Sequence, residues 1–252
     1  MKKIFVFLTL LSAASLFCNA QTFVFIGDSI TDGGWGSSAG RGIPSSQRNL
    51  TDLNHIYGHS YVMLCAGDYG ARYYKYENKF YNRGISGDTV AGILARCDND
   101  MLQYKPDVVS ILVGINDASR DDFDIAAWEK TYRSLLDKTM QALPGVHIML
   151  CTPFVANVGR THDSGKYETL AARVAGEASV VHRLASDYGA VLVPFDEMFA
   201  GLLSETPAAH SDYWIWDGVH PTAAGHRKMA DLWMQQYYTA PARVTVALPG
   251  GK

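Results

Sequence analysis

The sequence predicts an α/β protein, a three-layer doubly wound sandwich with a five-stranded parallel sheet. Short apolar runs alternate five times with longer segments of helical periodicity, and such connections cross over and place helices on both faces of a sheet. The composition, with 48% hydrophobic and 19% charged residues, is that of an ordinary globular protein. Without its N-terminal segment the chain keeps roughly 230 residues, enough for a single domain with a sizeable core.

The first twenty residues have the build of a cleavable secretory signal peptide. Lys2 and Lys3 are followed by an apolar run over residues 4–17 and by small residues up to Ala20. The apolar run is too short for a comfortable membrane span. An uncleaved anchor or a buried first strand is the alternative interpretation. We expect an exported protein, periplasmic or extracellular, with no stable membrane insertion after cleavage and a mature domain starting at residue 21.

Charge and cysteine content exclude several function classes. The formal net charge of −3 gives no electrostatic case for a nucleic-acid partner. Three scattered cysteines of the mature chain, Cys65, Cys97 and Cys151, form no CxxC pair, so buried free thiols are expected, with one disulfide as the alternative. His55 and His59 have i,i+4 spacing but no HExxH motif and no third ligand, so we expect no metal. Their place beside a long loop leaves open that one of them lines a substrate cleft.

The first predicted elements follow from local pattern. The apolar run 22–26 is typical of a strand buried on both faces. A polar, Gly- and Ser-rich stretch over 33–54 lacks periodicity and indicates a long loop. A helix is expected over 55–74 and a short strand over 79–81. Asp88 is expected to cap the next helix, whose apolar residues form a helical stripe.

The second half continues the alternation, and no internal repeat or linker divides it. Gly189 is a stop signal for the long helix before it. The tail from Ala240 onward is expected to be loosely held. Strands are expected over 107–113, 146–151 and 190–193, and helices over 125–143, 167–188 and 222–238.

Polar, glycine-flanked segments stand at three of the expected strand ends, at 27–29 (GDS), 86–88 (SGD) and 114–117 (GIND). A fourth, 217–221 (DGVHP), precedes the last helix. Each alone has a structural interpretation as a turn or an N-cap. In doubly wound sheets, however, ligands bind outside the carboxyl ends of the strands. Four such segments in this order therefore indicate one site.

These segments resemble the motif blocks of the SGNH or GDSL-type serine esterases. That family carries GDS(L), an N-x-x-x-S-G block, GxND and DxxH, which here lie at 27–30, 82–87, 114–117 and 217–220. Ile30 replaces the leucine, a swap that conserves volume. The resemblance extends from the first block to the last helix. It implies a flavodoxin-like sheet and a carboxylic ester hydrolase that uses no cofactor.

Three residues are the candidate catalytic triad. A serine hydroxyl is a poor nucleophile until a neighbouring base takes its proton, and His220 is the candidate base for Ser29. Asp217 precedes this histidine by three residues and can orient its ring from the same loop. The G-x-S-x-G elbow of the α/β-hydrolases is absent from the sequence. Triad chemistry is therefore expected on a different scaffold.

The resemblance also implies the donors of an oxyanion hole. They are the backbone N–H groups of Ser29 and Gly87 and the side-chain amide of Asn116. Gly84 is the rival of Gly87 for this position. Asp28 is expected to brace the nucleophile loop rather than transfer protons.

Two observations bear on the class of substrate: two tryptophans near the triad aspartate and a resemblance to a bacterial subgroup. Trp214 and Trp216 precede the triad aspartate and are either core residues or a wall that binds sugar or acyl groups. His226 is expected to be a surface or partly packed residue of the last helix. Segments 27–33, 82–89 and 110–117 are similar to a bacterial subgroup that deacetylates plant or microbial polysaccharides. This resemblance implies a saccharide ester, or another small-molecule ester, as the partner of the site.

Three alternatives accompany the acetylesterase hypothesis. A lysophospholipase or thioesterase would need a long apolar groove, which the polar stretch 33–54 does not indicate. A non-catalytic carbohydrate-binding protein would need a broken motif block, and none is broken. A metal-dependent deacetylase would need a cluster of metal-binding side chains, and the sequence shows none. The sugar, the acyl length and the oligomeric state stay open.

Overall fold

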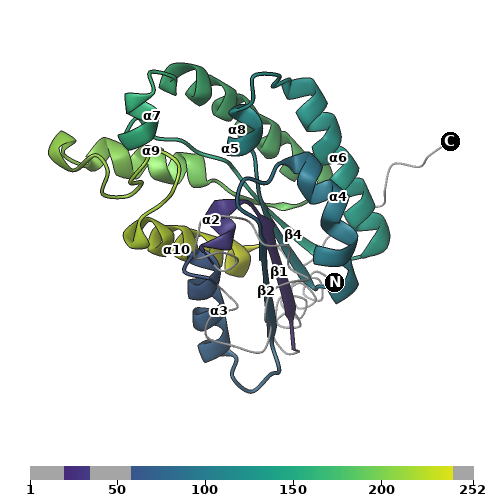
Figure 1. Cartoon of the computed structure of the whole chain (residues 1–252). Coiled ribbons are helices and arrows are strands. Elements are labelled where there is room, and N and C mark those ends of the chain that lie inside the picture. The colour runs from purple at the N-terminus through teal and green to yellow at the C-terminus, as the bar shows by residue number, and fades with distance from the viewer. Residues whose placement is uncertain (1–19, 35–57, 241–252) are drawn as a thin grey trace, which may run out of the picture.

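The computed structural model describes residues 20–34 and 58–240. Within these ranges, five strands form a single parallel sheet in the order β2-β1-β3-β4-β5 (Figure 1). This is the flavodoxin-like order, so the predicted doubly wound fold is confirmed. The strands are β1 (Thr22–Gly27), β2 (Lys79–Gly84), β3 (Val108–Leu112), β4 (His147–Cys151) and β5 (Val191–Val193).

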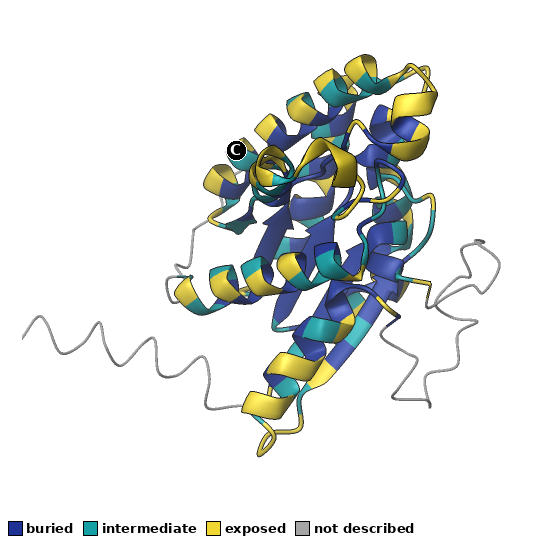
Figure 2. Cartoon of the chain, turned by 90° about the vertical axis from the view of Figure 1, so that its left-hand side faces the viewer, coloured by how far each residue is buried: buried dark blue, intermediate teal, exposed yellow. Residues whose placement is uncertain are grey.

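Helices cover both faces of the sheet, and Figure 1 shows α3 and α10 on the opposite side of the strands from α4 and α6. Side chains of β1 alternate between the two cores, because Phe23 and Phe25 pack under α3, α9 and α10 while Val24 and Ile26 pack under α4, α6 and α8. In Figure 2 the strands are buried and the helices expose only their outer faces. The first face carries α3 (Tyr61–Arg72), α9 (Phe195–Glu205) and α10 (Ala223–Thr239); the second carries α4 (Val90–Asp100), α6 (Ile125–Ala142) and α8 (Tyr167–Tyr188).

Several sequence predictions are confirmed. The long helix α8 has the predicted bounds, and Gly189 ends it in the left-handed conformation with φ 59°. Cys65, Cys97 and Cys151 are buried free thiols. As a separate observation, none of the helices in residues 20–34 and 58–240 has the length and apolar character that a membrane span requires. The predicted signal peptide and nearly all of the predicted loop 33–54 lie outside the described residues.

Other element predictions need correction. Helix α3 begins at Tyr61 rather than at 55, because the Ser60 hydroxyl accepts the Val62 N–H and caps it there. Strand β2 runs to Gly84 instead of ending at 81, since buried Asn82 and Arg83 hide the strand from a hydropathy pattern. Asp88 does not cap α4.

The cap of α4 lies one residue later than predicted. The side chain of Thr89 accepts the N–H of Gly92, which makes Thr89 the N-cap. Asp88 instead accepts the Thr89 N–H and binds Arg96. Its carboxylate therefore joins the N-cap of α4 to Arg96.

Helix α9 is absent from the prediction. Phe195, Met198, Phe199 and Leu202 recur at helical spacing, and the first turn carries acidic residues at 196 and 197. Phe195 and Phe199 are buried in the core. The short strand β5 runs directly into this helix through Pro194, so no loop composition separates the two elements.

Candidate active site

The nucleophile candidate stands where β1 ends. Asp28 caps the short helix α2 (Ser29–Asp32) by accepting the Ile30 N–H at 2.9 Å, so Ser29 is the first residue of that helix. Gly27 is required because a Cβ at this position would lie 2.5 Å from the carbonyl oxygen of Leu112. A glycine at the end of the strand therefore lets the chain turn tightly and present Ser29.

Ser29, His220 and Asp217 form a continuous line of hydrogen bonds. The Ser29 Oγ lies 2.9 Å from His220 Nε2, and His220 Nδ1 lies 2.8 Å from Asp217 Oδ2. The structure thus brings together the three residues that the sequence proposed as a triad. With the carboxylate accepting from Nδ1–H, Nε2 is bare and is placed to take the serine proton.

Asp217 is held as a charged acceptor. Its Oδ1 accepts the N–H groups of His220 at 2.7 Å and of Val219 at 3.0 Å. Burial opposes the charged form, but these hydrogen bonds and that of the His220 ring outweigh it and hold the pKa of Asp217 well below its ordinary value. The acid therefore stays ionised wherever His220 can act as a base.

A segment around α7 (Gly159–Asp163) secures the loop of the triad aspartate. The Ala156 N–H donates to the Gly218 carbonyl at 2.8 Å, and the Thr161 N–H donates to the Asp217 carbonyl at 3.3 Å. Arg160 Nη2 donates to Asp217 Oδ2 at 3.2 Å from a side chain that is 69% exposed. No motif in the sequence marks Arg160, and only the fold brings it to the aspartate.

The two glycines that compete as oxyanion donors differ in their surroundings. Gly87 has φ 83°, which favours glycine, and the space around its Cβ position is open. Gly84 is required for a different reason, because a Cβ there would lie 2.8 Å from the carbonyl oxygen of Asp28. Within residues 20–34 and 58–240, the N–H groups of Ser29 and Gly87 have no hydrogen-bond acceptor. The geometry therefore favours Gly87 over Gly84 as the donor.

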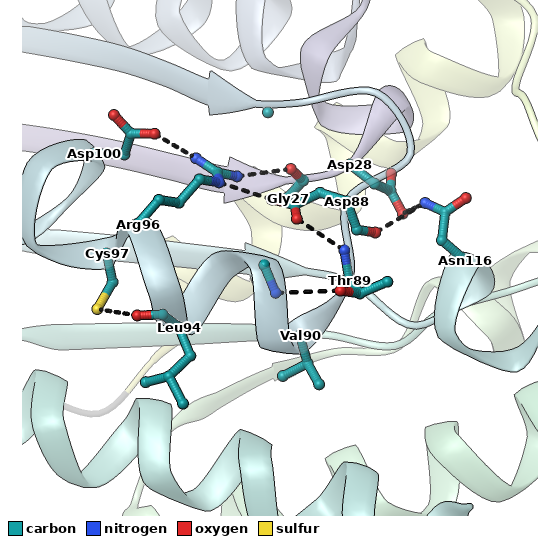
Figure 3. A network of polar contacts seen from close by, with 12 residues as sticks. Gly27, Asp28, Asp88, Thr89, Val90, Leu94, Arg96, Cys97, Asp100 and Asn116 are labelled. Carbon is teal, nitrogen blue, oxygen red and sulfur yellow. Dashed lines mark hydrogen bonds and ion pairs between the residues drawn. The ribbon is translucent and has the colours of Figure 1, made fainter. Parts of the chain in front are cut away.

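Asn116 is fixed by a polar network that Figure 3 shows from close by. Its Nδ2 donates to the Asp88 carbonyl at 3.0 Å and lies 3.5 Å from Asp28 Oδ2. Arg96 in turn binds the Asp88 carboxylate at 2.7 Å, that of Asp100 at 2.9 Å, and the Gly27 carbonyl at 3.2 Å. The guanidinium thus links the end of β1 to the turn that precedes α4, a role that sequence analysis missed.

Asp28 braces the nucleophile turn, as the sequence suggested. It is 1% exposed, and burial raises its pKa to about 7, with the Ile30 N–H and His220 acting in the opposite direction. The structure gives it contacts with Ile30 and Asn116 and none with the Ser29 hydroxyl. This placement suits a support of the turn rather than a proton carrier.

A second buried acid, Glu177 of α8, lies behind the turn at Gly114. Both of its carboxyl oxygens are buried, and neither has a hydrogen-bond partner among the residues that the structure describes. Burial, followed by the charges of Asp117 and Asp28, raises the pKa of Glu177 to about 9. The group is therefore protonated in the folded protein at neutral pH and ionised in the unfolded chain.

We expect Glu177 to make the protein less stable as pH rises from about 4.5 to about 9, because the folded state binds a proton that the unfolded state has lost. Glu177→Gln removes this contribution. The difference in Tm between Glu177→Gln and wild type should therefore be larger at pH 8.5 than at pH 5, by about 3 °C or more. At this chain size about 1 kcal/mol of unfolding free energy produces such a shift. Thermal unfolding of both proteins at the two pH values measures it. Exposed Glu168 of the same helix provides the control, Glu168→Gln, and an equal pH response of the two variants would contradict the expectation.

The triad opens into a cleft of about 480 Å³. Trp216 lies at its wall, 58% exposed, with its ring stacked near that of His220 at a centroid distance of 6.2 Å. His59, for which the sequence left this role open, also lines the cleft. The lining residues are Ser29, Ile30, Asp32, Gly33, Gly34, His59, Ser86, Trp216, His220, Pro221, Ala223 and His226.

Trp214 does not line this cleft. Its indole N–H donates to Thr206 Oγ1 at 2.8 Å, and its ring borders a separate hollow beside the end of α9. The two tryptophans on either side of buried Ile215 therefore differ, and only Trp216 faces the triad. A larger hollow of about 820 Å³ lies at the amino ends of β4 and β5. The triad lies at the other end of the sheet, where the strands have their carboxyl ends.

No group of three or more His, Cys, Asp or Glu side chains in the described part of the chain is arranged to hold a metal ion. The chemistry that the described side chains can perform is nucleophilic attack by a serine on an acyl carbon, with a histidine as base and backbone and amide donors for the oxyanion.

Comparison with known proteins agrees with this chemistry. The model of the GDSL-like lipase/acylhydrolase family matches residues 25–228. An acetylxylan esterase of Geobacillus stearothermophilus is 31% identical over 236 residues, which cover 86% of this chain and 94% of that protein.

Solved structures show the same fold. The crystal structure of a GDSL-like lipase from Parabacteroides merdae superposes with a TM-score of 0.73 at 31% identity, covering 86% of this chain and 95% of that one. A structure of the Geobacillus stearothermophilus acetylxylan esterase Axe2 gives a TM-score of 0.70 at 29% identity, covering 90% and 98%.

Proposed function

Since the chain belongs to the GDSL-like lipase/acylhydrolase family and is a carboxylic ester hydrolase, we propose that it removes acetyl groups from carbohydrate through an acyl-enzyme on Ser29. The observation that carries the proposal is the hydrogen-bonded line from Ser29 through His220 to Asp217, which opens into a cleft with an aromatic wall. The similarity to an acetylxylan esterase supports acetylated xylan or its oligosaccharides as the substrate class.

The reaction follows from the positions of these groups. Ser29 Oγ attacks the acetyl carbonyl carbon while its proton passes to His220 Nε2, which lies 2.9 Å away. The N–H groups of Ser29 and Gly87 are proposed to donate to the oxyanion, together with one hydrogen of the Asn116 amide, which gives up its 3.5 Å contact with Asp28 Oδ2. His220 then gives the proton to the departing sugar oxygen, leaving Ser29 acetylated. Water, deprotonated by the same histidine, releases acetate and restores the serine.

The lining of the cleft includes residue types that can bind a sugar. Asp32, His59 and His226 lie along it, and Trp216 supplies an exposed aromatic face. An aromatic face beside a few fixed polar groups is typical of a site that orients a polar ligand. A long acyl chain would instead require a continuous apolar channel, in which each buried methylene adds about 0.8 kcal/mol.

We expect kcat/KM to fall as the acyl chain lengthens from acetyl to octanoyl on a common aryl alcohol, an expectation that follows from the similarity to an acetylxylan esterase. Acetylated xylo-oligosaccharides should be deacetylated, and release of acetate measures this directly. Ser29→Ala serves as the blank for both substrate series. A rate that rises steadily from acetyl to octanoyl would reassign the protein as a lipid or thioester acyl hydrolase.

We also propose that the protein is exported. The basic Lys2 and Lys3 followed by the apolar run 4–17 support this. N-terminal sequencing of protein recovered outside the cytoplasm should begin at Gln21. A cell-associated chain that keeps residues 1–20 would refute the proposal.

A further inference from the structure

His226 lines the cleft, yet the acyl-enzyme mechanism gives it no role. It is the fourth residue of α10 and borders the same hollow as Ser29 and His220. The sequence suggested only a surface or partly packed side chain. The structure places its ring between the substrate cleft and the start of α3.

The contact with α3 fixes one nitrogen of the ring. Tyr61, the first residue of α3, donates its backbone N–H to His226 Nδ1 at 3.3 Å. The first N–H groups of a helix have no partner within the helix, so this bond satisfies one of them. A backbone N–H only donates, and His226 Nδ1 must therefore be the bare, accepting nitrogen.

The protonation state of the other ring nitrogen, Nε2, follows from this contact and from the pKa of the ring. Burial, followed by the nearby charge of His220, lowers the pKa of His226 to about 4, which leaves its ring neutral near pH 7. A neutral imidazole with a bare Nδ1 carries its proton on Nε2. In the described part of the chain no group accepts a hydrogen bond from this Nε2–H.

We infer that His226 Nε2–H donates a hydrogen bond to an oxygen of the saccharide in the cleft, which makes His226 a specificity-determining residue. The inference rests on the proposed deacetylation of carbohydrate. The bond to Tyr61 holds the ring, so little side-chain freedom is lost when substrate binds. A sugar stacked on Trp216 offers ring and hydroxyl oxygens as acceptors, whereas phenyl acetate offers only its ester oxygens.

Two amide substitutions separate the roles of the two ring nitrogens. His226→Asn places an amide oxygen near the position of Nδ1 and can still accept the Tyr61 N–H, but it has no donor at the position of Nε2. His226→Gln reaches the position of Nε2 with an amide N–H₂ and loses the acceptor near α3. His182→Asn is the matched control, since His182 lies on the outer surface of α8 and pairs with Glu197.

The measured quantity is the ratio of kcat/KM for an acetylated xylo-oligosaccharide to kcat/KM for phenyl acetate. We expect this ratio to fall about tenfold in His226→Asn, which corresponds to about 1.4 kcal/mol. His226→Gln should retain most of the ratio and lose Tm instead. His182→Asn should match wild type in both respects.

A ratio that stays at the wild-type value in His226→Asn, with the saccharide ester still hydrolysed by wild type, overturns the inference and leaves the proposed function intact. Failure of wild type to deacetylate the saccharide at all refutes the proposed function instead. Long-range ¹H–¹⁵N correlation spectra of the folded wild-type protein supply an independent test. They should show His226 protonated at Nε2 alone near pH 7, and a proton on Nδ1 would also overturn the inference.

Discussion

Ser29→Ala should reduce kcat for ester hydrolysis by about 10⁶-fold while leaving the fold intact. The hydroxyl supplies the atom that forms the acyl-enzyme, and its one hydrogen bond among the described residues is to His220. The turn does not depend on it, because Asp28 caps α2 through Ile30. Initial rates with an aryl acetate, together with Tm, measure both parts of the expectation.

Labelling with a fluorophosphonate provides the complementary measurement. Wild type should react at Ser29, and the alanine variant should not react at all. Ser86 also lines the cleft and is the nearest alternative nucleophile on the strand-end segments. A Ser29→Ala enzyme that keeps a tenth of the wild-type rate, or labelling at Ser86, would remove Ser29 from the proposed role.

The fold could be predicted because its signals are local. Most of the strands are short apolar runs, and β3 between Pro106 and Gly114 is bounded by residues that end regular structure. Prediction failed where that separation is missing. Helix α9 follows β5 through Pro194 alone, and β2 continues through buried Asn82 and Arg83, whose polarity suggests a loop.

Some residues of the site could be predicted from the sequence and others could not. The candidate catalytic residues lie at strand ends or helix starts, where sequence order and topology bring them together. They are Ser29, Gly87, Asn116, Asp217 and His220. The supporting residues carry no such mark. Arg160, Arg96 and His226 reach the site by tertiary contacts over long separations in sequence, and only the folded chain shows which neighbour each one binds.

The environments of the two tryptophans could not be predicted from the sequence either. Trp214 and Trp216 are equivalent in a pattern of residue types, and the sequence could not choose between core and cleft for either. Only the folded chain distinguishes them, because Trp214 donates its indole N–H to Thr206 while Trp216 lines the cleft of the triad.

Asp217→Asn should lower kcat by about 10⁴-fold, less than His220→Ala at about 10⁶-fold. The amide oxygen can keep the bonds that Asp217 Oδ1 accepts from the N–H groups of Val219 and His220, so the loop should hold its shape. The amide nitrogen then occupies the position of Oδ2 and presents hydrogens to His220 Nδ1, which must become the acceptor. The proton moves to Nε2, where it blocks acceptance of the Ser29 proton.

The same substitution turns a favourable contact of Arg160 into an unfavourable one. Its Nη2 donates to Asp217 Oδ2 in the wild type, and in the variant it would face an N–H₂ group. Asp212, on the exposed stretch before Trp214, is the matched control. We expect Asp212→Asn to stay within about twofold of wild-type kcat, because surface changes away from such contacts have small effects. Steady-state rates of both variants with an aryl acetate decide the matter. If Asp212→Asn proved the more damaging change, or Asp217→Asn kept more than a hundredth of the wild-type kcat, Asp217 would not be the residue that sets the tautomer of His220.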